Sequence, residues 1–113
     1  MRGEQYLNEP EQFAVVYDKG ASWVNKILVI KALPNGLALS RFGISVSSRV
    51  GGAVVRNRTK RRLREIIRRT RLIPGWDIII IARPAAARVN YAALKESIGS
   101  LFFKAKLMPA AVN

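Results

Sequence analysis

Residues Val55 to Arg71 read VRNRTKRRLREIIRRTR, and this stretch places the strongest constraint on the fold and on its partners. Nine of the sixteen residues after Val55 are Lys or Arg, eight of them Arg, and Glu65 is the one acid among them. Like charges three and four residues apart destabilise an isolated helix by roughly a few tenths of a kcal/mol per pair. A partner outside the chain must therefore compensate for this repulsion.

The spacing of the apolar residues in this stretch predicts one amphipathic helix. At 100° per residue, a single narrow face collects Val55, Thr59, Leu63, Ile66 and Ile67. The cations cover the remaining circumference as far as Arg71, and Arg56 alone enters the apolar arc, near the helix start. We predict that the helix begins near Ala53, after a break at Gly51-Gly52, and that Pro74-Gly75 ends it.

Three readings of the charged face compete. A solvated face would mix signs, with Glu–Lys pairs four residues apart, and it does not fit one Glu among nine cations. A membrane-surface helix would need bulky apolar side chains on its other side. Phosphate binding fits best because the planar guanidinium of Arg bonds two phosphate oxygens at once. RNA is favoured over duplex DNA, since no helix-turn-helix, zinc finger or basic zipper is present.

The composition bounds the rest of the chemistry. The chain has 113 residues and a formal charge of +13, and half of its residues are apolar, which suits one domain over residues 1–113 with flexible ends at 1–7 and 108–113. It has no Cys and no His, which excludes disulfides and thiolate metal sites and removes the commonest acid–base group. We expect no catalytic residue, metal or cofactor in this chain. With no signal or membrane segment seen, we expect a cytoplasmic protein.

The other segments predict an α-β-β-α-β-α order in an α+β fold. The first predicted element is a helix over Asn8–Lys19, with Asn8 as its cap and Glu11 completing a capping box. A strand over Trp23–Ala32 follows, then a turn at Pro34-Asn35-Gly36 and an antiparallel partner strand over Leu37–Ser48. After the basic helix we predict a strand over Asp77–Arg83, buried on both faces and parallel to the preceding strand, and a helix over Asn90–Lys106 with Asn90 as its cap. Trp23 either stacks on a ligand or closes the gap between helix and sheet.

The sequence also resembles a known family. GISVSSRVGGAVVRNRTKRRLRE, followed by PGWDIIIIARPAAA and NYAALKESIGSLFFKA, is similar to the protein subunit of bacterial ribonuclease P over roughly residues 7–107. The Arg56-Asn57-Arg58 core with its flanks is the most specific part of the match. The resemblance implies a two-layer sandwich with a mixed sheet and a left-handed βαβ crossover, like the second domain of small-subunit ribosomal protein five.

The resemblance also implies a function. In that family a catalytic RNA, which requires Mg²⁺, removes the 5′ leader of precursor tRNA, and the small basic protein binds that RNA and the leader in a 1:1 holoenzyme. Carried over by position, the residues that would bind the RNA subunit are Arg49, Arg56, Asn57, Arg58, Lys60, Arg61, Arg64 and Arg68. The leader cleft would contain Phe13, Tyr17, Asn25, Val29 and Lys31. From the residues alone, Phe13 and Tyr17 share one helix face, and packing in the core is the favoured interpretation of both.

Two other classes of function remain open. A ribosomal protein or a general RNA chaperone would share the charge, the size and the layout, but would give no reason for the Arg56-Asn57-Arg58 context. A protein-only nuclease would cleave RNA unaided, which the absence of His and the scattered acids argue against.

Overall fold

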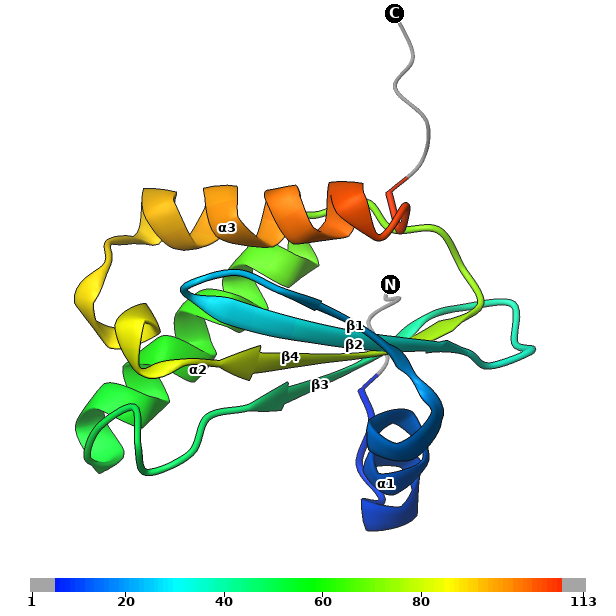
Figure 1. Cartoon of the computed structure of the whole chain (residues 1–113), viewed down its shortest axis with the longest axis horizontal. Coiled ribbons are helices and arrows are strands. Elements are labelled where there is room, and N and C mark those ends of the chain that lie inside the picture. Colours follow the sequence, from blue (N-terminus) through cyan, green and yellow to red (C-terminus); the bar gives the residue numbers. More distant parts are fainter. Residues whose placement is uncertain (1–5, 109–113) are drawn as a thin grey trace, which may run out of the picture.

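The computed structural model describes residues 6–108, which form a four-stranded mixed sheet with helices on both faces (Figure 1). The elements are α1 (Pro10–Lys19), β1 (Ala21–Val24), β2 (Leu28–Pro34), β3 (Arg41–Ser45), α2 (Ala53–Arg68), β4 (Trp76–Ala82), the 3-10 helix η1 (Pro84–Arg88) and α3 (Tyr91–Lys104). The strand order is β1-β2-β4-β3, in which β2 runs antiparallel to β1 and β4, and β3 runs parallel to β4. The predicted α+β fold, mixed sheet and βαβ crossover are confirmed, while the left-handed sense and the likeness to ribosomal protein five stay predictions.

The main hydrophobic core lies between the sheet and the pair α2 and α3. The buried face of α2 consists of Thr59, Leu63, Ile66 and Ile67, as its periodicity predicts. α3 contributes Leu94, Ile98, Leu101 and Phe102, and Asn90 caps this helix through a 2.9 Å hydrogen bond that its Oδ1 accepts from the Ala93 amide. Trp23 packs against the same core, so it closes the gap between helix and sheet.

A second, smaller core lies on the opposite face of the sheet, under α1. Its buried members are Leu7, Val16 and Ile79, with Phe13, Leu33 and Ile81 packed around them. The isoleucine run of β4 serves both cores, because alternate side chains of a strand point to opposite faces. Ile78 and Ile80 face α2 and α3, whereas Ile79 faces α1, so the prediction of a strand buried on both faces is confirmed.

The prediction of one strand over Trp23–Ala32 is wrong, because a tight turn at residues 25–27 divides it into β1 and β2. The side chain of Asn25 forms this turn: its Oδ1 accepts hydrogen bonds from the amides of Ile27 at 2.9 Å and Leu28 at 2.8 Å. Asn side chains bond nearby backbone in this way and thus replace a Gly or Pro turn signal. The two strands pair antiparallel, with Trp23 opposite Ile30.

The predicted antiparallel partnership of the Leu37–Ser48 segment with the preceding strand is also wrong. β3 occupies only Arg41–Ser45 and pairs with β4 alone, in parallel, while β4 lies between β3 and β2. The turn signal at Pro34-Asn35-Gly36 is nevertheless genuine, because Gly36 has a φ of +72°. The connection from β2 to β3 is therefore a crossing loop and not a hairpin.

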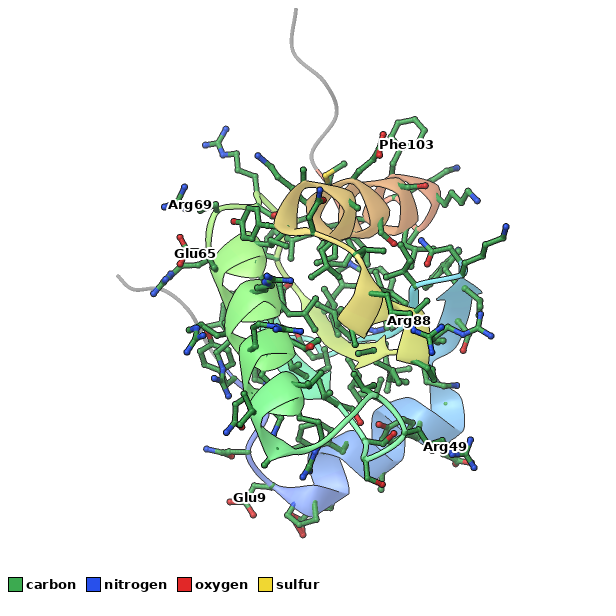
Figure 2. All side chains as sticks on the ribbon, turned by 90° about the vertical axis from the view of Figure 1, so that its left-hand side faces the viewer. Glu9, Arg49, Glu65, Arg69, Arg88 and Phe103 are labelled. Atoms are coloured by element: carbon green, nitrogen blue, oxygen red, sulfur yellow. The ribbon has the colours of Figure 1, made fainter. Side chains whose placement is uncertain are left out.

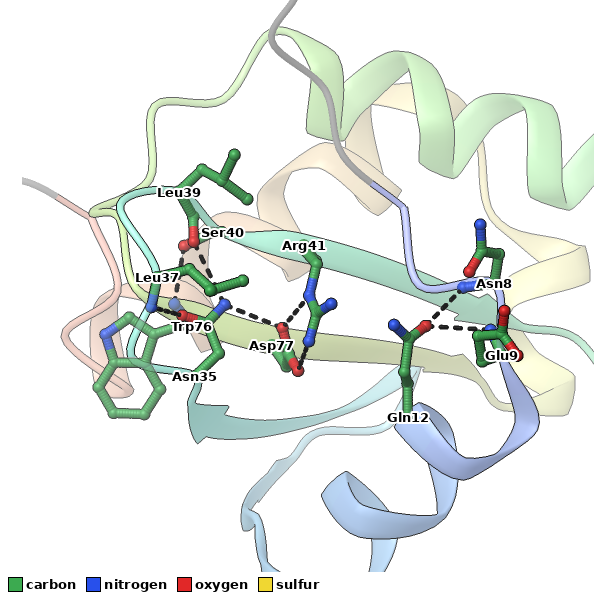
Figure 3. Close-up of polar contacts among 10 residues, drawn as sticks. All are labelled: Asn8, Glu9, Gln12, Asn35, Leu37, Leu39, Ser40, Arg41, Trp76 and Asp77. Carbon is green, nitrogen blue, oxygen red and sulfur yellow. Dashed lines mark hydrogen bonds and ion pairs between the residues drawn. The ribbon is translucent and has the colours of Figure 1, made fainter.

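The boundaries of two helices differ from the predicted ones. Glu9, not Asn8, precedes α1 as its N-cap, and the side-chain oxygen of Gln12 accepts the amides of both Asn8 at 2.9 Å and Glu9 at 3.0 Å (Figure 3). Gln12 thus does what was expected of Glu11. α2 ends at Arg68, so Arg71 lies beyond the helix, and Pro74-Gly75 marks the start of β4 instead.

Three residues of the ends that were predicted to be flexible, Tyr6, Leu7 and Met108, contact the folded part of the chain. The amide of Leu7 donates a 2.6 Å hydrogen bond to the carbonyl of Phe42, and Tyr6 forms an isolated bridge with Phe42. At the other end Met108 packs on the main core. The remaining residues of the two predicted ends, 1–5 and 109–113, lie outside the described residues. Within residues 6–108, no helix is long and apolar enough to cross a membrane.

A partly buried polar cluster fixes the end of the sheet where β4 begins (Figure 3). Arg41 of β3 binds Asp77 of β4 with both ends of its guanidinium group, Nε to Oδ1 at 2.8 Å and Nη2 to Oδ2 at 2.7 Å. Asn35 donates to the same carboxylate at 2.9 Å. Burial raises the pKa of Asp77, but the hydrogen bonds from Arg41 and Asn35 outweigh it, and the pKa lies below its ordinary value. Arg41 and Asp77 are opposite each other in the strand register, so their bond sets the alignment of β3 on β4.

Candidate nucleic-acid interface

The outer surface of α2 is almost entirely cationic. The helix begins after Gly52, whose backbone is extended, and its buried face packs against the core. The remaining side chains therefore face outward. The structure leaves exposed Asn57, Arg61, Arg64 and Arg68, and it leaves half-buried Arg56, Arg58, Lys60 and Arg62. Arg49 is exposed in the connection between β3 and α2. Seven of the eight side chains that the resemblance assigns to RNA-subunit binding thus lie on α2, and Arg49 lies in the connection before it.

Two of these arginines carry unsatisfied donors. The Nε atoms of Arg56 and Arg58 are enclosed by protein, yet neither has a hydrogen-bond partner among the described residues. A buried donor without a partner costs about 1–3 kcal/mol. Protein contacts therefore do not fully satisfy these two half-buried arginines in the first two turns of α2.

Glu65 is the one acid of α2, and it compensates part of the positive charge at the C-terminal end of the helix. Its carboxylate forms ion pairs with Arg68 and with Arg69, the latter at 2.7 Å (Figure 2). The hydrogen bond from Arg68 and the charge of Arg69 lower the pKa of Glu65, so it stays ionised. Net positive charge therefore remains in both halves of α2, with three cations and no acid over residues 53–60 and four cations and one acid over residues 61–68.

The aromatic residues of α1 face the side of the sheet that α2 leaves free. Phe13 is half-buried in the small core, where its ring lies on Gly43 of β3. Tyr17, one turn later, is 41% exposed. Phe13 therefore belongs partly to the core, whereas the ring of Tyr17 is available to a ligand. An exposed aromatic ring can stack on an unpaired base.

A cavity of about 330 Å³ connects the aromatic face with the cationic helix. It lies along β3, and its walls include Phe13 and Arg64, which the resemblance assigns to the leader and to the RNA subunit respectively. Tyr6 and Leu7 supply another wall. Sequence reasoning missed Tyr6 because it placed residues 1–7 in a flexible end. The pair Tyr6-Leu7 lies just before the start of the predicted helix, and its apolar character was the signal that it packs on the fold.

The sheet face beside α1 contains only part of the predicted leader cleft. Val29 and Lys31 alternate with the buried side chains of β2 and so point to the α1 side of the sheet, half-buried. Asn25 does not share this face, and that expectation is wrong. Its Nδ2 donates to Ser97 Oγ of α3 at 2.8 Å, on the other side of the sheet, while its Oδ1 forms the β1–β2 turn. The side chain is fully occupied by these structural contacts.

Known proteins resemble this chain along most of its length. A family profile described as Ribonuclease P matches residues 1–106. The ribonuclease P protein component of Dehalococcoides mccartyi strain 195 is 43% identical over 111 residues, which cover 98% of this chain and 92% of that protein. The protein of the same description from Roseiflexus castenholzii is 39% identical over 116 residues and covers 100% of this chain and 95% of its own length.

Solved structures agree in fold. The RNase P protein of Staphylococcus aureus superposes with a TM-score of 0.84 at 31% identity, covering 92% of this chain and 97% of that one. The RNase P protein of Thermotoga maritima gives a TM-score of 0.81 at 31% identity, covering 89% and 97% of the two chains. Both the sequence and the backbone are therefore shared along nearly the whole length of the described fold.

Proposed function

Because the chain belongs to the ribonuclease P protein family, we propose that it binds the catalytic RNA of ribonuclease P through α2 and the 5′ leader of precursor tRNA beside α1. In this proposal the RNA subunit, with Mg²⁺, cleaves the leader, and the protein assists it in a 1:1 complex in the cytoplasm. The chain itself supplies binding and positioning and no reacting group.

The observation that carries the proposal is the state of the N-terminal half of α2. Its cations have no acidic neighbour on the helix before Glu65, and two of them hold buried Nε donors that lack a partner within residues 6–108. Such a surface is stable only when an anion is bound or when the cations stay well hydrated. A folded RNA provides phosphates in several directions, and this suits side chains spread around most of the helix.

The second support is the separation of two kinds of contact. Cations dominate α2, and the aromatic side chains of Phe13 and Tyr17 lie beside α1, so phosphates of a folded RNA and bases of a single strand would bind different surfaces. The cavity shared by Phe13 and Arg64 lies where these surfaces meet. A leader emerging from the RNA subunit would pass from one surface to the other at this point.

Reconstitution tests the proposal. The protein is combined with a bacterial ribonuclease P RNA at low Mg²⁺, and release of the leader from precursor tRNA is measured. We expect the protein to increase cleavage, and no protein-dependent gain would overturn the proposal. If about six cations meet phosphates, log K for the RNA subunit should fall against log salt with a slope of about −4 to −5.

A matched pair of variants locates the contact. Arg58→Gln with Lys60→Gln should weaken RNA-subunit binding and reduce the salt slope by about 1 for each lost contact. Lys104→Gln with Lys106→Gln removes the same charge from the exposed end of α3 and should change both quantities little. Equal losses in the two variants would show that net charge, and not α2, determines the affinity.

A further inference from the structure

A second cationic surface lies at the end of the sheet where β3 and β4 finish, the end that faces the viewer in Figure 2. Three chain segments meet there: the β1–β2 turn at 25–27, the connection at 46–52 and the segment at 83–90. These segments contribute four exposed cations and no acid, and the cations are Lys26, Arg49, Arg83 and Arg88. Only Arg49 is among the residues that the resemblance assigns to a function.

Hydrogen bonds hold the segments together. Arg83 donates from Nη1 to the carbonyl of Asn25 at 2.7 Å, and its amide donates to the carbonyl of Ile27 at 2.9 Å, which places it beside Lys26. Arg62 of α2 donates to the carbonyl of Val89 at 3.3 Å, directly after Arg88. These bonds fix the relative positions of cations that come from distant parts of the sequence.

The surface continues onto α2. Arg58 lies one turn before Arg62 on the same helix face, and its buried Nε lacks a partner within the described part of the chain. α2 therefore has cations toward η1 as well as on its outer side. An RNA strand that bound only along the outer side of α2 would not contact the cations at the end of the sheet.

The side chains at this end of the sheet suit paired RNA better than unpaired RNA. The three segments contain no Phe, Tyr or Trp, so they offer no platform on which unpaired bases could stack. They offer guanidinium and ammonium groups, with the exposed hydroxyl of Ser48, which can bond a ribose 2′-hydroxyl. Double-helical RNA is recognised by its shape through phosphates and 2′-hydroxyls.

We infer that the surface formed by Lys26, Arg49, Arg83 and Arg88 binds the backbone of a double-helical RNA stem, as a second contact separate from the aromatic face of α1. The inference rests on the proposed function, in which that stem belongs to the catalytic RNA. In this inference the two surfaces bind RNA of different structure: the end of the sheet binds paired RNA, and the side beside α1 binds unpaired RNA.

The test uses a blunt RNA duplex of about 16 base pairs and a single-stranded RNA of equal length, with the full chain in each case. Lys26→Gln with Arg88→Gln removes two exposed cations that make no hydrogen bond or ion pair in the described structure, so the fold should be retained, which thermal unfolding verifies. We expect duplex affinity to fall on the order of tenfold and the salt slope to decrease by about 2. The Lys104→Gln, Lys106→Gln control should stay near the parent protein.

The outcomes separate this inference from the proposed function. A selective loss of duplex binding supports it, together with a parallel loss for the catalytic RNA. Equal losses in the two double variants, or a loss confined to the single strand, would overturn it. If the parent protein fails to increase cleavage by the catalytic RNA, the proposed function fails, and the duplex measurement still decides whether this surface binds paired RNA.

Discussion

The ring of Phe13 lies directly on Gly43: a Cβ atom at position 43 would come 2.5 Å from Cε2 and 2.6 Å from Cζ of that ring. Only a residue without a side chain allows α1 to approach β3 this closely. Because Phe13 also lines the cavity that contains Arg64, its packing and its proposed contact with RNA depend on the same position. A variant at Phe13 would therefore change fold and binding together.

Gly43→Ala should destabilise the fold by about 1–3 kcal/mol, since the new methyl group overlaps the Phe13 ring. Gly99→Ala is the matched control, because nothing lies within 4 Å of a Cβ at that position in α3. That change should stabilise the protein by about 0.5–1 kcal/mol through helix propensity. Urea unfolding measures both. Adding Phe13→Leu to Gly43→Ala should recover part of the loss, and strictly additive effects would show that the two residues do not interact.

Tyr17→Ala is the cleaner test of the leader face, because this ring is exposed and not part of the small core. We expect the holoenzyme to bind leader-bearing precursor tRNA more weakly by about 1–3 kcal/mol, the value of one stacked base, with mature tRNA unchanged. Val15→Ala removes another exposed apolar side chain of α1 and should affect neither RNA. Equal losses for precursor and mature tRNA would contradict a leader contact.

Asn25→Ala should lower stability and leave leader preference unchanged. The variant loses the turn bonds to Ile27 and Leu28 and the bond to Ser97, with an expected cost of about 1–3 kcal/mol. Thermal unfolding measures that cost. The ratio of affinities for precursor and mature tRNA should stay at the parent value. A changed ratio of the two affinities in a fully folded sample would show that Asn25 contributes to leader binding.

Asp77 should make the stability depend on pH in acid. Its pKa is lowered in the fold, so the bond with Arg41 stabilises the protein above the ordinary carboxyl pKa of about 4, and this contribution is lost as the pH falls through the lowered value. Asp77→Asn should cost about 2 kcal/mol at pH 7 and flatten the acid side of the stability curve. Urea unfolding from pH 7 to pH 2 measures both. An unchanged acid limb would exclude Asp77 as the titrating group.

The buried face of α2 could be predicted from the sequence because the spacing of its apolar residues fits only a helix. Five positions at helical spacing among cations define the inner face without knowledge of the partner elements; Thr59, Leu63, Ile66 and Ile67 are buried, and Val55 is half-buried. Asn90 and the isoleucines of β4 were predictable for the same reason, since a cap and a fully apolar run are local features. The end of α2 was not, because Thr70 and its neighbours carry no stop signal before Pro74.

The hairpin and the strand order could not be read from local patterns. The segment Trp23–Ala32 is apolar throughout, and its turn depends on side-chain bonds of one Asn that appear only when β1 and β2 pair. Placing β4 between β2 and β3 depends on long-range pairing. For the site, the basic residues were predictable from sequence, but the union of Phe13, Tyr6 and Arg64 around one cavity arises from packing.

The division of the interior into a large core and a small one has a consequence for motion. α1 is held by few buried side chains, whereas α2 and α3 share an extensive core. Amide hydrogens of α1 should therefore exchange with solvent through local openings that leave the rest of the molecule folded. If leaders bind beside α1 as proposed, a first helix that opens by itself would adjust to leaders of different sequence, while the arginines of α2 keep a fixed spacing.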